Sequence, residues 1–327
     1  ILNTVAVSME IAQMVSENSQ LGVSFRLAHS REVDYQESTS PNADLRRLTA
    51  TATSNPFGAT YEGIAIPGFM NEVHEWRQTY GADLVAMLAS VSGVGGLAWQ
   101  LQDETGRPDY GFSLTRVQQT SWTYTMIHEL GHNMGAHHHK EQSQDSGPGP
   151  GVFTYSAGWR WTGNDGGRYV SVMSYEAGQY YTDGLDHMRT PYFSSPLINY
   201  QGNATGHPQH GDNARTIREM KHVLAAYRQV PVMAVQGKVR KPGGGVLPGA
   251  RVEAPGAGAL MFTDPSGGYA FPFLQPGKQV LRYSHPGYYT LTDTVDIFAG
   301  TTFQRDVILD ELVDIVISGR VLKYGGT

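Results

Sequence analysis

The sequence contains no cysteine among its 327 residues. This absence excludes disulfide bonds, cysteine-ligated zinc and iron–sulfur centres. No run of about 18 apolar residues occurs, so no transmembrane helix is expected. Basic residues are also few, because 24 Lys and Arg stand against 30 Asp and Glu and give a net charge of −6. A chain of this charge has no expected nucleic-acid partner, since such binding needs clustered basic residues.

Apolar residues make up 40% of the chain, which is enough for sizeable cores. At about 100–200 residues per domain, the length predicts two domains. The boundary is expected near residue 230, where helical periodicity ends and short β-type runs begin to alternate with Pro and Gly turns. We therefore predict a first domain over 1–230 and an all-β sandwich over 231–312. A near-repeat of residues 235–244 at 317–326 predicts that 313–327 form the truncated start of a second sandwich repeat.

The first domain mixes helical and strand-like patterns, which predicts an α+β fold. Helices are expected where apolar residues recur at helical spacing, over 1–20, 42–48, 72–79, 121–134 and 214–227. Strands are expected over 21–28, 82–90 and 96–101, where apolar residues alternate or form short runs.

The segment from His128 to His138 carries the chemistry. His128 and His132 are four residues apart, so on a helix their imidazoles share one face and can chelate one metal ion. Glu129 lies about 100° round the helix from His128, where its carboxylate reaches a metal-bound water rather than the metal. Gly135 can end the helix in a left-handed conformation, and the turn returns His138 as a third ligand. Three neutral imidazoles with one open position are the ligand set of catalytic zinc.

Other potential ligands lie outside this pattern. His137 and His139 flank the third ligand, and the spacing predicts that they do not bind the metal. Calcium is a second, weaker hypothesis, based on the turn carboxylates Asp165, Asp183 and Asp186, although neither turn matches a calcium loop.

Residues 128–138 resemble the signature of the metzincin zinc peptidases. Metzincins also carry a methionine turn beneath the zinc, and Met173, which lies 35 residues after His138, fits that place. The resemblance implies one catalytic Zn²⁺ and a twisted mixed sheet with a long active-site helix. In astacin-like and serralysin-like metzincins a tyrosine two residues after the methionine ligates zinc or supports the transition state. Tyr175 stands there, with a role as a packed core aromatic as the alternative.

Outlying segments resemble the bacterial reprolysin-like, adamalysin-related branch over about residues 1–228. They include Phe25–Leu27, Tyr80–Val85, Gly95–Ala98 and Asp212–Arg215. In related peptidases the substrate adds to an edge strand, which places it here on Gly95, Gly96, Leu97 and Ala98.

Three departures from the branch stand out. His139 replaces the usual aspartate, the usual cysteines are absent, and the first strand of the family is missing before Ile1. The last departure suggests cleavage or trimming upstream. Residues 235–311 resemble the carboxypeptidase regulatory-like, transthyretin-like sandwich, which is commonly an accessory module.

These features favour an exported, zinc-dependent endopeptidase that acts through a Glu-assisted, zinc-bound water. The expected substrate is a polypeptide, the expected state is a monomer, and the expected location is outside a bacterial cell, at its surface or in the periplasm. A catalytically silent binding protein that keeps the peptidase fold and acts through its sandwiches is the main alternative. A zinc amidase, or another hydrolase of non-peptide substrates, would share the same metal site.

Overall fold

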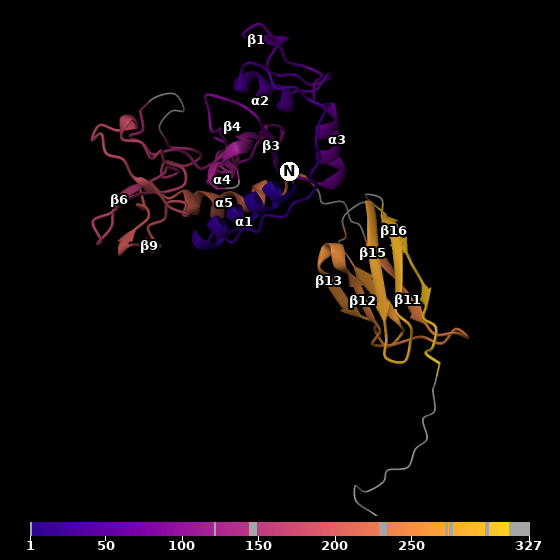
Figure 1. Ribbon diagram of the computed structural model, residues 1–327. Coiled ribbons are helices and arrows are strands. Elements are labelled where there is room, and N and C mark those ends of the chain that lie inside the picture. Colours follow the sequence, from indigo (N-terminus) through magenta and orange to yellow (C-terminus); the bar gives the residue numbers. More distant parts are fainter. Residues whose placement is uncertain are drawn as a thin grey trace, which may run out of the picture. The chain divides into compact units, whose positions relative to one another are not determined.

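The computed structural model describes residues 2–120, 122–143, 149–228, 234–271, 274, 277–297 and 301–313. The chain divides into two compact units, Ile1–Val230 and Pro231–Thr327, each with its own hydrophobic core (Figure 1). Residues 314–327, where a second sandwich repeat is expected to start, lie outside the described residues. Within the described part of the chain, no helix is long and apolar enough to cross a membrane.

The described residues of the first unit form five α-helices. They are α1 (Leu2–Asn18), α2 (Pro41–Thr49), α3 (Asn71–Tyr80), α4 (Thr125–Asn133) and α5 (Asn213–Leu224). Figure 1 shows α1, α4 and α5 close together in the unit. Their apolar faces share one core, to which Val15, Ile127 and Ile217 contribute fully buried side chains. Burial of these faces, rather than helix propensity alone, holds the short helices in place.

A mixed three-stranded sheet packs against α4. β5 (Phe112–Arg116) lies in the middle, parallel to β3 (Val85–Ala89) and antiparallel to β4 (Gly96–Ala98). α4 contacts both β4 and β5 on one side and α1 on the other. The active-site helix therefore runs through the interior of the unit, and all nine of its residues are buried.

The remaining strands of this unit are short. β1 (Thr60–Tyr61) and β2 (Ile64–Ala65) form one hairpin, and β9 (Asn199–Tyr200) and β10 (Asn203–Ala204) form another. β6 (Arg160–Thr162), β7 (Arg168–Val170) and β8 (Met188–Arg189) form a small sheet in which β7 is central. β8 pairs in parallel with β7, and the last residue of β7, Val170, lies three residues before Met173.

Two expectations for this unit are wrong. Residues 21–28 form no strand, because side chains of α1 take their hydrogen bonds: the Phe25 N–H donates to Gln13 Oε1, and the Ser16 hydroxyl donates to the Val23 carbonyl. The active-site helix begins at Thr125 rather than near 121 and is not long. Before it, the Thr123 hydroxyl donates to the Gln119 carbonyl in a local turn that competes with helix.

The second unit is an all-β sandwich, as expected. One sheet has the order β14 (Gly268–Phe271), β11 (Ala234–Arg240), β17 (Thr302–Gln304), and β18 (Val307–Ile308) also pairs with β11. The other has the order β13 (Ala259–Phe262), β12 (Arg251–Ala254), β15 (Gly277–Ser284), β16 (Leu291–Ile297). Their inner faces bury alternate side chains such as Val235, Leu281 and Val295.

Candidate metal centre

Two of the three histidines project from α4. The i, i+4 spacing places the rings of His128 and His132 on one face, with centroids 4.9 Å apart. The helix stays helical here because Ile127 and Leu130 bury their side chains in the core of the first unit. The two imidazoles are therefore held in position by the packing of the whole helix.

The third histidine is returned by a turn at the end of α4. Gly135 has φ +89°, in the left-handed region, and a Cβ there would lie 2.6 Å from Val152 Cγ2. Asn213, the first residue of α5, holds the returning chain through two hydrogen bonds to the backbone of His137, at 2.9 and 3.1 Å. Glycine is required for the turn, and α5 fixes where His138 comes to lie.

The three side chains converge on one point. His138 Nε2 lies 3.2 Å from His128 Nε2 and 3.0 Å from His132 Nε2. Tetrahedral zinc with Zn–N bonds of about 2.0–2.1 Å separates its nitrogen ligands by about 3.3 Å. The ligand atoms of these three buried residues all lie within 4.8 Å of one another, and they form the sole such group among the described His, Asp and Glu residues. The set can hold a zinc ion.

Hydrogen bonds at the far side of two rings set their tautomers. His128 Nδ1 lies 2.8 Å from the Val172 carbonyl, and His132 Nδ1 lies 2.7 Å from Gln100 Oε1. Each Nδ1 must carry the proton to donate to these oxygens, so each Nε2 presents a lone pair to the common point. Burial, together with the neighbouring His138, lowers the pKa of both rings well below the usual value. Neutral imidazoles with Nε2 lone pairs are the form that binds zinc.

Glu129 is buried beside the cluster, with 5% of its surface exposed. Burial raises the pKa of its carboxyl to about 8, and the positive charge of Arg189 opposes that rise. Its side chain occupies the space over Gly96 of β4, where a Cβ would lie 2.5 Å from Glu129 Cγ and Oε1. The glycine thus makes room for the acid, a use that the sequence did not reveal.

Met173 and Tyr175, which follow α4 in the chain, also lie close to the cluster. Met173 is fully buried, and its Sδ would lie 2.5 Å from a Cβ on Gly131, which stands between the two helical histidines. The Tyr175 ring lies near the cluster, with centroids 5.0 Å from His138 and 6.2 Å from His128. Met173 therefore packs beneath α4, and Tyr175 lies beside the histidines.

The expected substrate strand lies at a sheet edge. β4 pairs with β5 on one side only, and Gly95, Gly96, Leu97 and Ala98 are all partly exposed. α4, which carries Glu129, also contacts β4. The structure thus brings an open strand edge, the acid and the metal-binding histidines into one region.

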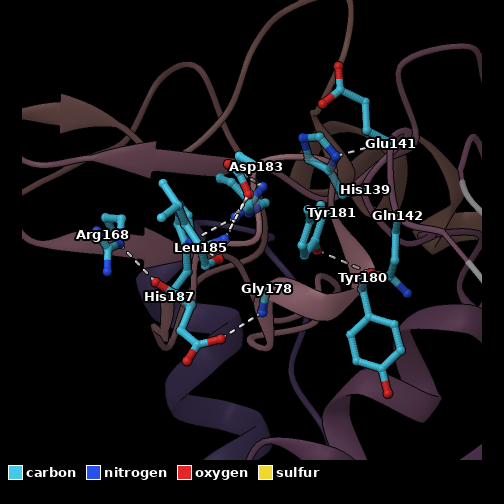
Figure 2. A network of polar contacts seen from close by, with 12 residues as sticks. His139, Glu141, Gln142, Arg168, Gly178, Tyr180, Tyr181, Asp183, Leu185 and His187 are labelled. Atoms are coloured by element: carbon cyan, nitrogen blue, oxygen red, sulfur yellow. Dashed lines mark hydrogen bonds and ion pairs between the residues drawn. The ribbon is translucent and has the colours of Figure 1, made fainter.

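His139 lies outside the cluster, where its ring packs near Trp159 and Tyr181 (Figure 2). Burial lowers the pKa of His137 and of His139 to about 4, so both rings are neutral at pH 7. His137 Nδ1 accepts the backbone N–H of His138 at 2.7 Å and so helps to orient the third ligand.

The carboxylates considered for calcium are engaged with the protein. Asp165 accepts hydrogen bonds from the Tyr169 hydroxyl and the Gly167 N–H. Asp183 pairs with Arg160 at 3.1 Å, and Asp186 accepts the Gly178 N–H at 2.7 Å (Figure 2). These contacts support turns, and the described residues offer no second ligand cluster beside the three histidines.

Sequence reasoning missed three contributors to the site. They are the Gln100 amide, the Val172 carbonyl and the absent side chain of Gly131. A glycine between two helical ligands was a readable signal for close packing. The other two act across long separations in the chain, and local patterns carry no record of them.

Comparison with protein families gives two matches. Residues 1–185 match Metallo-peptidase family M12, and residues 234–310 match the carboxypeptidase regulatory-like domain. The expected order of a reprolysin-like zinc peptidase followed by a regulatory-like sandwich is confirmed.

Curated relatives match between 64% and 75% of the chain. Proteins named peptidyl-Asp metalloendopeptidase from Stenotrophomonas maltophilia and Xanthomonas campestris pv. campestris are each 26% identical over 211 residues, covering 64% of this chain and 44% and 43% of theirs. One from Pseudomonas aeruginosa is 27% identical over 264 residues, covering 75% of this chain and 39% of its own. The chain thus spans less than half the length of these relatives. The family match covers more than half of the chain and agrees with the histidine geometry, so the chain belongs to metallo-peptidase family M12.

Proposed function

We propose that the chain is a zinc-dependent endopeptidase with its site on α4 and β4. The observation that carries the proposal is the convergence of three imidazole Nε2 atoms, with a buried carboxylate beside them. His128, His132 and His138 would hold the ion. Zinc bound there supplies Lewis acidity toward water and the scissile carbonyl.

Residues of the chain carry out the proton transfers and bind the substrate. Glu129 accepts the proton of the attacking water and then delivers a proton to the leaving amine. Its buried side chain, for which Gly96 leaves room, holds the carboxylate beside the metal-binding histidines. The substrate backbone adds to the exposed edge of β4, so that main-chain hydrogen bonds supply affinity for any sequence.

Tyr175 is proposed to support the transition state from beside His138. Its hydroxyl is the one polar group of a ring that packs 5.0 Å from that ligand. Replacing Tyr175 with Phe should lower kcat about tenfold while zinc content stays at one per chain. An unchanged kcat would leave the ring with a packing role only.

We propose that the enzyme recognises an aspartate of the substrate, because the relatives named above are peptidyl-Asp metalloendopeptidases. The relatives named above come from bacteria. We also propose that this protein acts outside a bacterial cell. Immunodetection in cell, periplasm and medium fractions of the native host tests the location, and retention in the cytoplasm would contradict it.

The decisive experiment compares the wild type with Glu129→Gln. Both should bind one zinc by elemental analysis, whereas kcat/KM on an Asp-containing peptide should fall at least about a thousandfold in the variant. Glu141→Gln, a change of a nearby acid that the mechanism does not use, is the matched control. Zinc binding without cleavage in the wild type would favour the silent binding protein. Release of products other than peptides would favour a different hydrolase.

A further inference from the structure

Arg189 is an arginine whose placement the mechanism above leaves unused. It ends β8, pairs with Val170 of β7 in parallel register, and precedes Thr190, whose N–H donates to the Val170 carbonyl at 2.9 Å. Its Nη2 lies 3.4 Å from the carbonyl oxygen of Ser174, the residue after Met173. The small sheet therefore brings this cation to the segment that packs beneath α4.

Arg189 contacts both chain neighbours of Tyr175. Its Nη2 lies 3.4 Å from the Ser174 carbonyl oxygen and 3.6 Å from Glu176 Oε2. The Tyr175 ring itself lies 5.0 Å from the ring of His138. The guanidinium is thus anchored on the segment that lies beside the metal-binding histidines.

The guanidinium is only partly satisfied by its protein partners. Its side chain is 17% exposed, and its Nε is buried without a hydrogen-bond partner among the described residues. The sole carboxylate paired with it there is Glu176, at 3.6 Å, and the Glu176 side chain is 54% exposed. A planar guanidinium offers five donors and favours a bidentate carboxylate, so this one retains unused capacity for an acid.

The segment that carries Arg189 is braced. Arg160 pairs with Asp183 at 3.1 Å, and the Gly178 N–H donates to Asp186 at 2.7 Å (Figure 2). The Tyr181 hydroxyl donates to the Tyr175 carbonyl at 3.0 Å. Tyr181 is itself buried. Such bracing presents the guanidinium in a fixed place, which reduces the ordering cost of binding a charged side chain.

We propose that Arg189 selects an acidic substrate side chain by pairing its guanidinium with the carboxylate of an aspartate next to the scissile bond. The inference rests on the proposed endopeptidase function and names the residue that reads the substrate. Glu176 then acts as a stand-in acid, which the substrate carboxylate displaces or joins. Arg189 remains a specificity residue, since it contacts the substrate away from the reacting atoms.

The test uses two peptides that are identical except for Asp or Asn at the selected position, and measures kcat/KM for each. The wild type should prefer the Asp peptide at least tenfold. Arg189→Gln should lower kcat/KM for the Asp peptide about 30- to 100-fold and change the Asn peptide less than threefold, at unchanged zinc content. Arg168→Gln, a change of an exposed arginine in the same small sheet, is the matched control and should leave both values unchanged.

Glu176→Gln provides a second variant that does not remove the arginine. It should lower KM for the Asp peptide two- to fivefold and leave the Asn peptide unchanged, because the competing carboxylate is gone. An Arg189→Gln protein that keeps the wild-type Asp/Asn ratio, or loses both activities equally, would overturn the inference. A wild type that cleaves both peptides equally would also overturn it while the endopeptidase function stands. Zinc-loaded wild type that cleaves neither peptide would overturn the proposed function together with the inference.

Discussion

The two units of this chain bury different kinds of side chain. The first buries ionisable groups together at its centre, including His128, Glu129 and His132. The second has a core of aliphatic and aromatic residues, in which the Tyr269 and Tyr283 hydroxyls form a hydrogen bond of 2.8 Å. Buried ionisable groups cost stability unless something pairs with them. Among the described residues, the buried cluster of ionisable groups therefore belongs to the first unit.

Removal of a zinc ligand should give the largest loss of activity and should change the stability of the first unit alone. His132→Ala leaves two ligands, so zinc content should fall below one per chain and kcat/KM below about a thousandth of the wild-type value. Calorimetry should show a lower unfolding temperature for the first unit only, because bound zinc stabilises the unit that binds it. His210→Ala, at an exposed histidine, is the control. Full activity in His132→Ala would contradict the metal site.

Filling the space over Gly96 should give the second-largest loss of activity. In Gly96→Ala the added Cβ would lie 2.5 Å from Glu129 Cγ, so the carboxylate must shift. A displacement of about 1 Å at a catalytic group costs on the order of 100-fold, and kcat/KM should fall by that factor with zinc retained. The matched control is Gly256→Ala in the sandwich, where the nearest atom lies 3.9 Å from the new Cβ. Equal kinetics in the two variants would show that Glu129 tolerates movement.

Loss of the Gln100 amide should have a smaller effect, which is limited to the affinity for zinc. Gln100→Leu removes the acceptor of the His132 Nδ1–H, 2.7 Å away, and frees the ring to rotate. Loss of such a partner typically weakens metal affinity 10- to 100-fold, which competition with a zinc-chelating dye would measure. Gln102→Leu, two residues along and exposed, should retain wild-type affinity. Unchanged affinity in Gln100→Leu would assign ring orientation to the helix rather than to the amide.

The sandwich should show the smallest effect, confined to stability. Tyr283→Phe removes one hydroxyl from a fully buried side chain, while the Tyr269 hydroxyl keeps its bond to the Arg305 carbonyl at 2.7 Å. The free energy of unfolding of the second unit should fall by about 1 kcal/mol, measured by denaturant titration. Peptidase activity should not change. A loss of activity would mean that the second unit contributes to the chemistry of the first.

Much of the site could be predicted because its central relations are local. His128, Glu129 and His132 lie within five consecutive residues, so helix geometry alone relates them. The same locality explains the sandwich strands, where turns and alternation repeat over short distances. The start of α4 and the expected strand at 21–28 were wrong because side chains of Thr123, Gln13 and Ser16 take backbone partners that a periodicity argument ignores.

The sequence by itself determined the identity of the metal ligands, the neighbouring acid and the order of the two units, since spacing along the chain sets these. Only the tertiary structure decided what orients and surrounds them. Gln100 reaches His132 across 32 residues and the Val172 carbonyl reaches His128 across 44. Arg189 comes near Ser174 and Glu176 through the pairing of β7 with β8. Such contacts depend on how helices and sheets pack, and residues far apart in the chain acquire fixed distances only when the core closes around them.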